Sequence, residues 1–300
     1  METVAFKSGY IVLVGRPNVG KSTLLNHLVG QKVSITSRRP QTTRNRILGI
    51  RTRADAQLLF VDTPGIHDPQ NPLNRYMMRM AQGALGSVDV AVLVVEAGVF
   101  REDDARALDL LRPLGKPVIL VVNKVDTLKD KSRLLPFLQT MGERYPFAEV
   151  LPMSARAPAD AKVLEDLLVK YLPEGEPFYG EDEITDRSMR FMAAELIREQ
   201  VFRSVGQELP YASAVGIDEF KEEGRLTRIQ ATIYVERPGQ KAILIGAGGE
   251  RLKQIGQAAR LELEKMLGTK VFLGLWVKVK TGWATDANVL HSIGYDRNDG

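Results

Sequence analysis

The chain has 300 residues, of which 44% are hydrophobic, enough to form the cores of two domains without covalent cross-links. It contains no cysteine, which excludes disulfides and thiolate metal sites, and its three histidines, His27, His67 and His291, lack the spacing of a metal site. The net charge of +4 is too small for a chain of this length to indicate a partner by itself.

No segment is typical of a secretory signal or of a membrane-spanning helix. The apolar run from Val88 to Val95 is far shorter than the ~20 residues that a helix needs to cross a bilayer. This predicts a soluble protein, and the absence of cysteine fits a reducing cytoplasm. We also expect the protein to be monomeric. A peripheral contact with the inner surface of the cytoplasmic membrane stays open.

The first predicted element is a buried strand over residues 10–14, followed by a phosphate-loop pattern and a helix over 22–28. Glycines in such a loop turn backbone N–H groups toward phosphates, and the helix N-terminus adds positive potential. Lys21 is expected to reach the β- and γ-phosphates and to serve catalysis, and the Ser22 hydroxyl to bind Mg²⁺. The alternative is a glycine-rich turn with a surface lysine. The predicted phosphate-binding residues are Gly15, Arg16, Pro17, Asn18, Val19, Gly20, Lys21, Ser22 and Thr23.

A strand pair over residues 46–52 and 57–61 comes next and leads into Asp62-Thr63-Pro64-Gly65. Asp62 is placed to hold Mg²⁺ through water, and the Gly65 N–H to meet a γ-phosphate and act in catalysis. We include Thr63 and Pro64 in the nucleotide-binding set.

Another buried strand, residues 117–122, leads into Asn123-Lys124-Val125-Asp126. Guanine presents two adjacent donors, and the carboxylate of Asp126 offers two acceptors side by side. Adenine would place an acceptor against that carboxylate, so such a site rejects the wrong base by about 10⁴ or more. Asn123 is expected to bond the base edge, and the Lys124 stem to cover the base.

The last strand of this half, near residues 149–153, ends at Ser154 and Ala155, where a backbone N–H could contact the guanine carbonyl. This signal is weak, and an ordinary loop fits it equally well. With a closing helix over 161–171, the order of elements predicts a doubly wound α/β domain. All the motifs lie at carboxyl ends of strands, where such a sheet binds ligands.

Together these motifs resemble a P-loop GTPase of the translation-factor-related class, which implies GTP, GDP and Mg²⁺ as ligands. The segment 39–44 fits the effector segment of that class, so Thr42 or Thr43 should close on Mg²⁺. We favour Thr43, with a catalytic role, although spacing alone does not decide and the segment also fits an ordinary polar loop.

The residue after Gly65 is Ile66, where many GTPases have a water-orienting glutamine. Isoleucine cannot orient water by hydrogen bonding, so we expect slow intrinsic hydrolysis and a different catalytic arrangement. His67 is a candidate base, but an ordinary surface histidine is the better interpretation.

Residues 173–183 are rich in proline, glycine and acidic side chains, which predicts a linker. The next elements are a helix capped by Asp186 and ending near Ser204, strands over 212–220 and 226–235, a short helix over 240–245, a glycine-rich turn, a helix over 250–267 and a strand over 270–280.

This order, with G-x-x-G between two helices, resembles a type II KH domain, which implies RNA binding. The central loop positions, Ala247 and Gly248, lack the Lys or Arg that KH loops often have, so the flanking helix is expected to contribute more. A glycine hinge is the alternative. The predicted RNA-binding residues are Lys241, Ile245, Gly246, Ala247, Gly248, Gly249, Arg251, Lys253 and Arg260.

Charge and aromatic content agree with this interpretation. Residues 225–280 contain 11 Lys and Arg against 4 Asp and Glu, whereas residues 181–224 contain 5 against 11. Such a basic block suits a polyanion, although solvated charges are a common alternative. Trp276 is expected in the core, and Trp283 fits the core or base stacking equally well.

Nearly the whole chain resembles the Era family of bacterial GTPases, with a GTPase domain at 1–173, a linker at 174–184 and a KH domain with a tail at 185–300. The resemblance implies that the protein binds the 3′ region of 16S rRNA and assists maturation of the small (30S) ribosomal subunit. Two rivals stay open: an RNA-binding factor with GTP as a structural ligand only, and a GTPase serving an RNA-modifying reaction.

Overall fold

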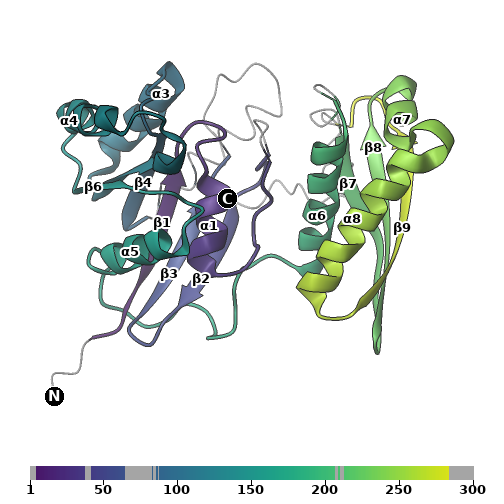
Figure 1. The fold of residues 1–300 in the computed structure, drawn as a ribbon. Helices are drawn as coiled ribbons and strands as arrows, with labels where there is room; N and C mark the ends of the chain where they lie inside the picture. The colour runs from purple at the N-terminus through teal and green to yellow at the C-terminus, as the bar shows by residue number, and fades with distance from the viewer. Residues whose placement is uncertain are drawn as a thin grey trace. The chain divides into compact units, whose positions relative to one another are not determined.

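The computed structural model describes residues 5–37, 42–64, 88–206 and 213–283, together with Gly83, Gly86 and Leu209. The chain forms two compact units, Met1–Asp186 and Arg187–Gly300, and each is described by itself (Figure 1). Among the described residues, no helix has both the length and the apolar composition required to cross a bilayer. Gly65, Ile66, His67 and the tail after Trp283 lie outside the described residues.

In the described part of the first unit, six strands form one sheet in the order β2-β3-β1-β4-β5-β6. Only β2 runs antiparallel to its neighbour. Nearly every residue of β1, β3, β4 and β5 is buried, as expected of strands that are covered on both faces. The strands are β1 Lys7–Val14, β2 Ile47–Thr52, β3 Ala56–Asp62, β4 Val90–Glu96, β5 Val118–Asn123 and β6 Glu149–Pro152.

Helices cover this sheet and fix the carboxyl ends of its strands. Leu108 of α3 and Met141 of α4 belong to one apolar cluster with alternate residues of the strands. Helices α1 and α5 contact each other and lie in front of the strands in Figure 1. The helices are α1 Lys21–Val29, α3 Glu102–Leu111, α4 Leu134–Arg144 and α5 Pro158–Val169. The predicted doubly wound α/β architecture is therefore confirmed.

The connecting segment, residues 173–186, is fastened to the first unit. The fully buried side chain of Gln57 holds its middle part. The Gln57 Oε1 accepts hydrogen bonds from the N–H groups of Phe178 (2.7 Å) and Tyr179 (3.0 Å), and its Nε2 donates to the Tyr179 carbonyl (2.8 Å). Farther along, the Ile50 N–H of β2 donates to the Ile184 carbonyl (2.9 Å).

The second unit has the predicted order α-β-β-α-α-β. Its sheet has the order β7-β8-β9, with β7 antiparallel to β8 and β8 parallel to β9. Helix α8 contributes Ile255, Ala259 and Leu263, one turn apart, to the core beneath the sheet. The elements are α6 Met189–Ser204, β7 Ser213–Glu223, β8 Leu226–Val235, α7 Pro238–Ile245, α8 Glu250–Leu267 and β9 Lys270–Val279.

Two expectations for this unit are wrong. Ser188, not Asp186, caps α6, because its side chain accepts a hydrogen bond from the Phe191 N–H. Trp276 is not in the core: it is 50% exposed, because strand alternation directs it away from the helices. Trp283, by contrast, is completely buried.

Candidate functional site

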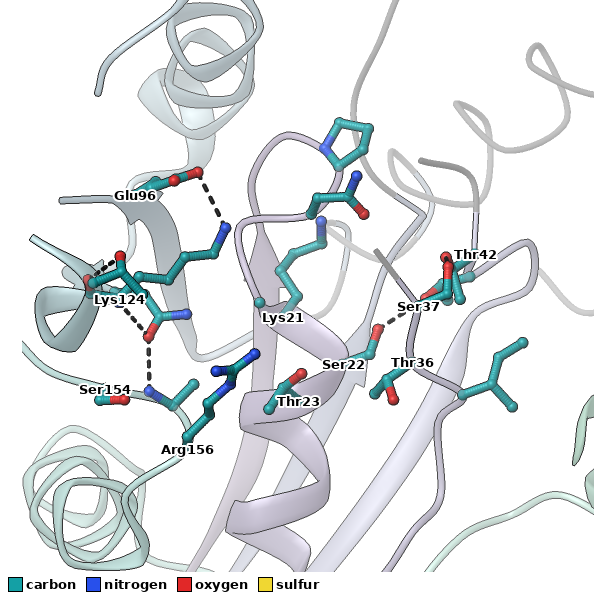
Figure 2. A pocket seen from close by; sticks show the side chains of 18 of the residues that line it. Lys21, Ser22, Thr23, Thr36, Ser37, Thr42, Glu96, Lys124, Ser154 and Arg156 are labelled. Carbon is teal, nitrogen blue, oxygen red and sulfur yellow. Dashed lines mark hydrogen bonds and ion pairs between the residues drawn. The ribbon is translucent and has the colours of Figure 1, made fainter. Parts of the chain in front are cut away.

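A pocket of about 470 Å³ lies at the carboxyl ends of the strands of the first unit, the place where an open α/β sheet binds ligands (Figure 2). Residues from the phosphate loop, residues 35–37 and 42–43, and the ends of β4 to β6 line it together. The lining residues are Pro17, Asn18, Gly20, Lys21, Ser22, Thr23, Ile35, Thr36, Ser37, Thr42, Thr43, Glu96, Asn123, Lys124, Asp126, Thr127, Ser154, Ala155 and Arg156.

The phosphate loop is held in a shape that only glycine permits. Gly20 has a φ of 110°, and a Cβ on it would lie 2.3 Å from the Nδ2 of Asn123. Lys21 is buried, and its Nζ donates to the carbonyls of Gly15 (2.8 Å) and Arg16 (3.1 Å). Burial lowers the pKa of Lys21 to about 8, against an opposing influence of Asp62. The Lys21 amine therefore lies inside the loop rather than in solvent.

Three predicted Mg²⁺ ligands lie together at the edge of this loop. The Ser22 hydroxyl donates to Asp62 Oδ2 (2.7 Å) and lies 2.9 Å from Thr43 Oγ1, while Ser34 Oγ donates to the same carboxylate oxygen (3.0 Å). Asp62 is buried, and burial raises its pKa. Its Oδ1 makes no hydrogen bond with any described residue.

These oxygens fit Mg²⁺. No group of three or more His, Asp or Glu side chains is assembled as a metal site among the described residues. Mg²⁺ needs no such cage, because it takes one or two carboxylates and completes its octahedron with phosphates and water. The orphaned Asp62 Oδ1 and the hydroxyls of Ser22 and Thr43 are suitable donors.

The two adjacent threonines have different partners. Thr43 Oγ1 lies 3.4 Å from Asp62 Oδ2, whereas Thr42 Oγ1 makes a 2.6 Å hydrogen bond with Ser37 Oγ. Of the two, Thr43 is thus the one that the structure brings to Ser22 and Asp62.

At the other end of the pocket, Asn123 braces three segments. Its Nδ2 donates to the Val19 carbonyl (2.7 Å), and its Oδ1 accepts from the N–H groups of Lys124 and Ala155 (both 2.7 Å). The Ser154 N–H donates to Asp160 (2.8 Å). Both N–H groups considered for the guanine carbonyl are thus engaged in holding the loop, whereas the exposed Asp126 lines the pocket.

Sequence reasoning missed Glu96, at the carboxyl end of β4. Its Oε2 accepts from Lys124 Nζ (3.1 Å; Figure 2) and from Arg16 (2.7 Å), so it joins the phosphate loop to the base-binding segment. Partial burial would raise the pKa of Glu96, but hydrogen bonds from Arg16 and Lys124 outweigh it and hold that pKa below its ordinary value. The sequence feature that could have identified Glu96 is its position at the carboxyl end of a central strand.

Several predicted residues lie beside the pocket rather than in its lining. The Arg16 side chain points to Glu96 and to the buried Asp104 (3.1 Å), and the Thr63 hydroxyl donates to the Leu13 carbonyl (2.9 Å). Gly15, Val19, Asp62 and Pro64 do not line the pocket either. Gly65 lies outside the described residues.

In the second unit, the G-x-x-G turn joins α7 to α8. Gly246, Gly248 and Gly249 all have positive φ, and Ala247 and Gly248 are exposed at its tip. The flanking cations are not equivalent. Arg251 donates to the Ile243 carbonyl and Arg260 pairs with Glu264 (2.8 Å). The remaining two, Lys241 and Lys253, form no ion pair with a described residue, and Ile245 packs partly against the core.

Comparison with known proteins identifies the family. Residues 10–124 match the family described as 50S ribosome-binding GTPase, and residues 208–284 match the KH domain. The chain is 55% identical over 296 residues to the GTPase Era of Xanthomonas campestris pv. campestris, covering 98% of this chain and 99% of that protein. The chain belongs to the Era family of GTPases. The GTPase Era of Stenotrophomonas maltophilia is also 55% identical to this chain, over 289 residues.

Two solved Era structures match nearly the whole chain. An Aquifex aeolicus Era variant bound to GDP·AlF₄⁻ has a TM-score of 0.92 and 41% identity, covering 97% of this chain and 99% of that one. Era in complex with MgGDPNP and nucleotides 1506–1542 of 16S ribosomal RNA has the same TM-score, identity and coverage. A GTPase domain followed by a KH domain is therefore confirmed, and the enzyme activity is that of a GTPase.

Glu96→Gln is expected to weaken GTP and GDP binding by about tenfold in this Era-family protein, because Arg16 and Lys124 lose their shared carboxylate. Guanine selectivity should remain, since Asp126 is untouched. The measurement is equilibrium binding of both nucleotides, with Glu102→Gln, an exposed acid paired to Arg106 on α3, as the matched control. Equal affinities in wild type and Glu96→Gln would show that the network has no positioning role.

Proposed function

We propose that this Era-family GTPase is a GTP-dependent RNA-binding protein that binds the 3′ region of 16S rRNA and assists assembly of the small ribosomal subunit. The observation that supports this most is the full-length likeness to an Era solved with MgGDPNP and nucleotides 1506–1542 of 16S rRNA. The protein would act in the cytoplasm. We keep residues 1–173 as the GTPase domain, 174–184 as the linker and 185–300 as the RNA-binding part.

The nucleotide is GTP or GDP, with Mg²⁺ as the metal. In our proposal the phosphate loop cradles the phosphates, Lys21 neutralises them, and Asp126 selects guanine. Ser22, Thr43 and Asp62 would hold Mg²⁺, which when bound would supply positive charge to neutralise charge that develops on the phosphates. The convergence of these three side chains within hydrogen-bonding distance supports the assignment.

For hydrolysis, we infer a slow intrinsic rate. Ile66 has no group that can orient water, and we assign the catalytic roles to Lys21, Thr43 and the Gly65 N–H. A partner or a reordered switch segment would complete the arrangement.

A continuous physical route leads from the predicted Mg²⁺ site to the connecting segment. Thr43 lies four residues before β2, and the N–H of Ile50 in β2 holds the carbonyl of Ile184. Gln57, on the neighbouring β3, holds Phe178 and Tyr179. Ordering of Thr43 by GTP would therefore change the conformation of the segment that leads to the RNA-binding unit. A switch requires contacts of this kind, which differ between the GTP and GDP states.

Gln57→Leu tests this route. Loss of its three hydrogen bonds to residues 178 and 179 should loosen the middle of the connecting segment while leaving the nucleotide pocket intact. We expect unchanged GTP affinity but a loss of at least half of the difference in RNA affinity between the GTP-analogue and GDP forms. Gln139→Leu, at an exposed position of α4, is the matched control. A full nucleotide-dependent difference in Gln57→Leu would contradict the route.

Binding to RNA of defined sequence tests the function itself. The full chain should bind a strand matching the 16S 3′ end more tightly than a scrambled strand, and should sediment with small rather than large ribosomal subunits. Lys253→Glu should weaken RNA binding and leave GTP binding unchanged. Equal affinity for the matching and scrambled strands would contradict the proposed RNA target.

A further inference from the structure

The sheet of the second unit has one face against its helices and one face turned away from them. In β9, Val271 and Val277 are buried in the core, whereas Phe272 and Trp276 are 46% and 50% exposed. Because side chains alternate along a strand, the even-numbered residues share the outer side. We call this the outer face; it consists of Arg228, Gln230, Thr232 and Tyr234 of β8 and Lys270, Phe272, Gly274, Trp276 and Lys278 of β9.

The two exposed aromatic rings of the outer face form one row. Phe272 and Trp276 are four residues apart on the same strand, about 13 Å at the usual rise per residue. The register places Arg228 opposite Phe272 and Thr232 opposite Trp276. Single exposed aromatics are ordinary, but two in a row on a flat sheet offer a surface on which planar groups can stack.

Gly274 keeps the surface between the two rings flat. A Cβ there would lie 2.0 Å from Gln230 Oε1 and 3.0 Å from the Trp276 ring, so a larger residue would displace these two side chains. The indole therefore leans over the glycine instead of standing upright. Gln230 Oε1 lies against Gly274, is buried and makes no hydrogen bond with a described residue.

On β8 and β9, the charged side chains of the outer face are all cationic, which suits a polyanion on this part of the sheet. Its cations are Arg228, whose guanidinium lies 4.9 Å from the Phe272 ring centroid, and the exposed Lys270 and Lys278. Arg228 also lies 3.6 Å from Glu223, and Lys270 lies 3.8 Å from Glu264. None of the outer-face positions of β8 and β9 is acidic. The acidic residues of this sheet belong to β7: the Thr232 hydroxyl donates to Asp218 (2.7 Å) and Glu219 lies opposite Gln230, so acidic side chains border the outer face along β7.

From this geometry we propose that the outer face is a second RNA-binding surface, where bases of a single strand stack on Phe272 and Trp276 while Arg228, Lys270 and Lys278 neutralise the backbone. The surface is separate from the G-x-x-G turn and extends the proposed function. Exposed aromatics among cations on a sheet are typical of single-strand recognition. The core of a protein interface would instead be depleted of charged residues.

Affinity for a fluorescent 15-nucleotide oligouridylate tests the proposal, because uridylate bases stack weakly on each other and are free to stack on protein. The double variant Phe272→Ala/Trp276→Ala should weaken binding by the full chain about tenfold or more. Leu261→Ala, which truncates a 53% exposed side chain on α8, should bind like wild type. The double variant Phe272→Tyr/Trp276→Phe keeps both rings and should retain affinity, which separates stacking from misfolding.

A comparison with Lys253→Glu separates this proposal from the proposed function. If only the alanine double variant loses affinity, the outer face binds RNA and the G-x-x-G assignment fails. If only Lys253→Glu loses affinity, the outer face is not an RNA site and this proposal is overturned.

Direct contact is tested with the same strand containing 4-thiouridine, followed by photocrosslinking and peptide mapping. Crosslinks in the peptide that contains Phe272 and Trp276 are expected. Crosslinks confined to residues 237–260, with no loss of affinity in the alanine double variant, would overturn the proposal. Loss of self-association in that variant at unchanged RNA affinity would assign the face to a second copy of the chain and would also overturn it.

Discussion

Replacing Lys21 by methionine is expected to weaken GTP binding by about a hundredfold at pH 7, because the substitution removes the buried cation at the phosphate end of the pocket. Burial lowers the pKa of Lys21 in the free protein to about 8. Phosphate prefers the protonated amine, so binding above this pH must take up a proton. GTP affinity of the wild type should therefore fall as the pH rises from 8 to 9, by at most about tenfold per unit.

Titration calorimetry at several pH values, in buffers of different ionisation enthalpy, measures both the affinity and the proton uptake. Lys21→Met should bind weakly without this decline, whereas Lys129→Met, at an exposed lysine, should behave like wild type. A pH-independent wild-type affinity between pH 7 and 9 would contradict the buried, poised state of Lys21.

The second large effect is expected from Asp126→Asn, which exchanges one acceptor oxygen for a donor amide. Guanine then meets a donor where it needs an acceptor, so GTP affinity should fall at least about a hundredfold. Xanthine presents a donor and an acceptor at the same two positions, so xanthosine triphosphate should become the preferred nucleotide. Competition between the two triphosphates measures this preference.

Asp130→Asn is the matched control, because Asp130 is an exposed carboxylate that caps a short turn through Ser132 and does not line the pocket. It should keep the wild-type preference. An unchanged GTP preference in Asp126→Asn would refute the assignment of Asp126 as the guanine selector.

Much of the nucleotide pocket could be predicted because its parts are local motifs at strand ends. Gly20 is needed for the conformation of the phosphate loop, and Asn123 begins a segment that directly follows a buried strand. The parallel sheet then brings these separate motifs together. Spacing does not distinguish Thr42 from Thr43, because both residues satisfy the same pattern. Only the tertiary structure shows which of them lies near Ser22 and Asp62.

Residues that act through partners far away in the sequence could not be predicted. Glu96 can act in the site only because the fold places Arg16 and Lys124 next to it. Gln57 likewise needs the connecting segment to lie along β3. Trp276 was expected in the core because a strand pattern shows two faces without saying which one the helices cover. The residue type of Trp276 favours burial, but the strand register directs its side chain to the exposed face.

The most direct test of the central claim, that the nucleotide state controls RNA binding, is the affinity of the full chain for a 16S 3′ strand at fixed salt with GDP and with a non-hydrolysable GTP analogue. We predict binding that is about fivefold or more tighter with the analogue, a difference that the scrambled strand does not show. Equal affinity in the two nucleotide states would contradict the claim, because a ligand that favours neither state moves no equilibrium.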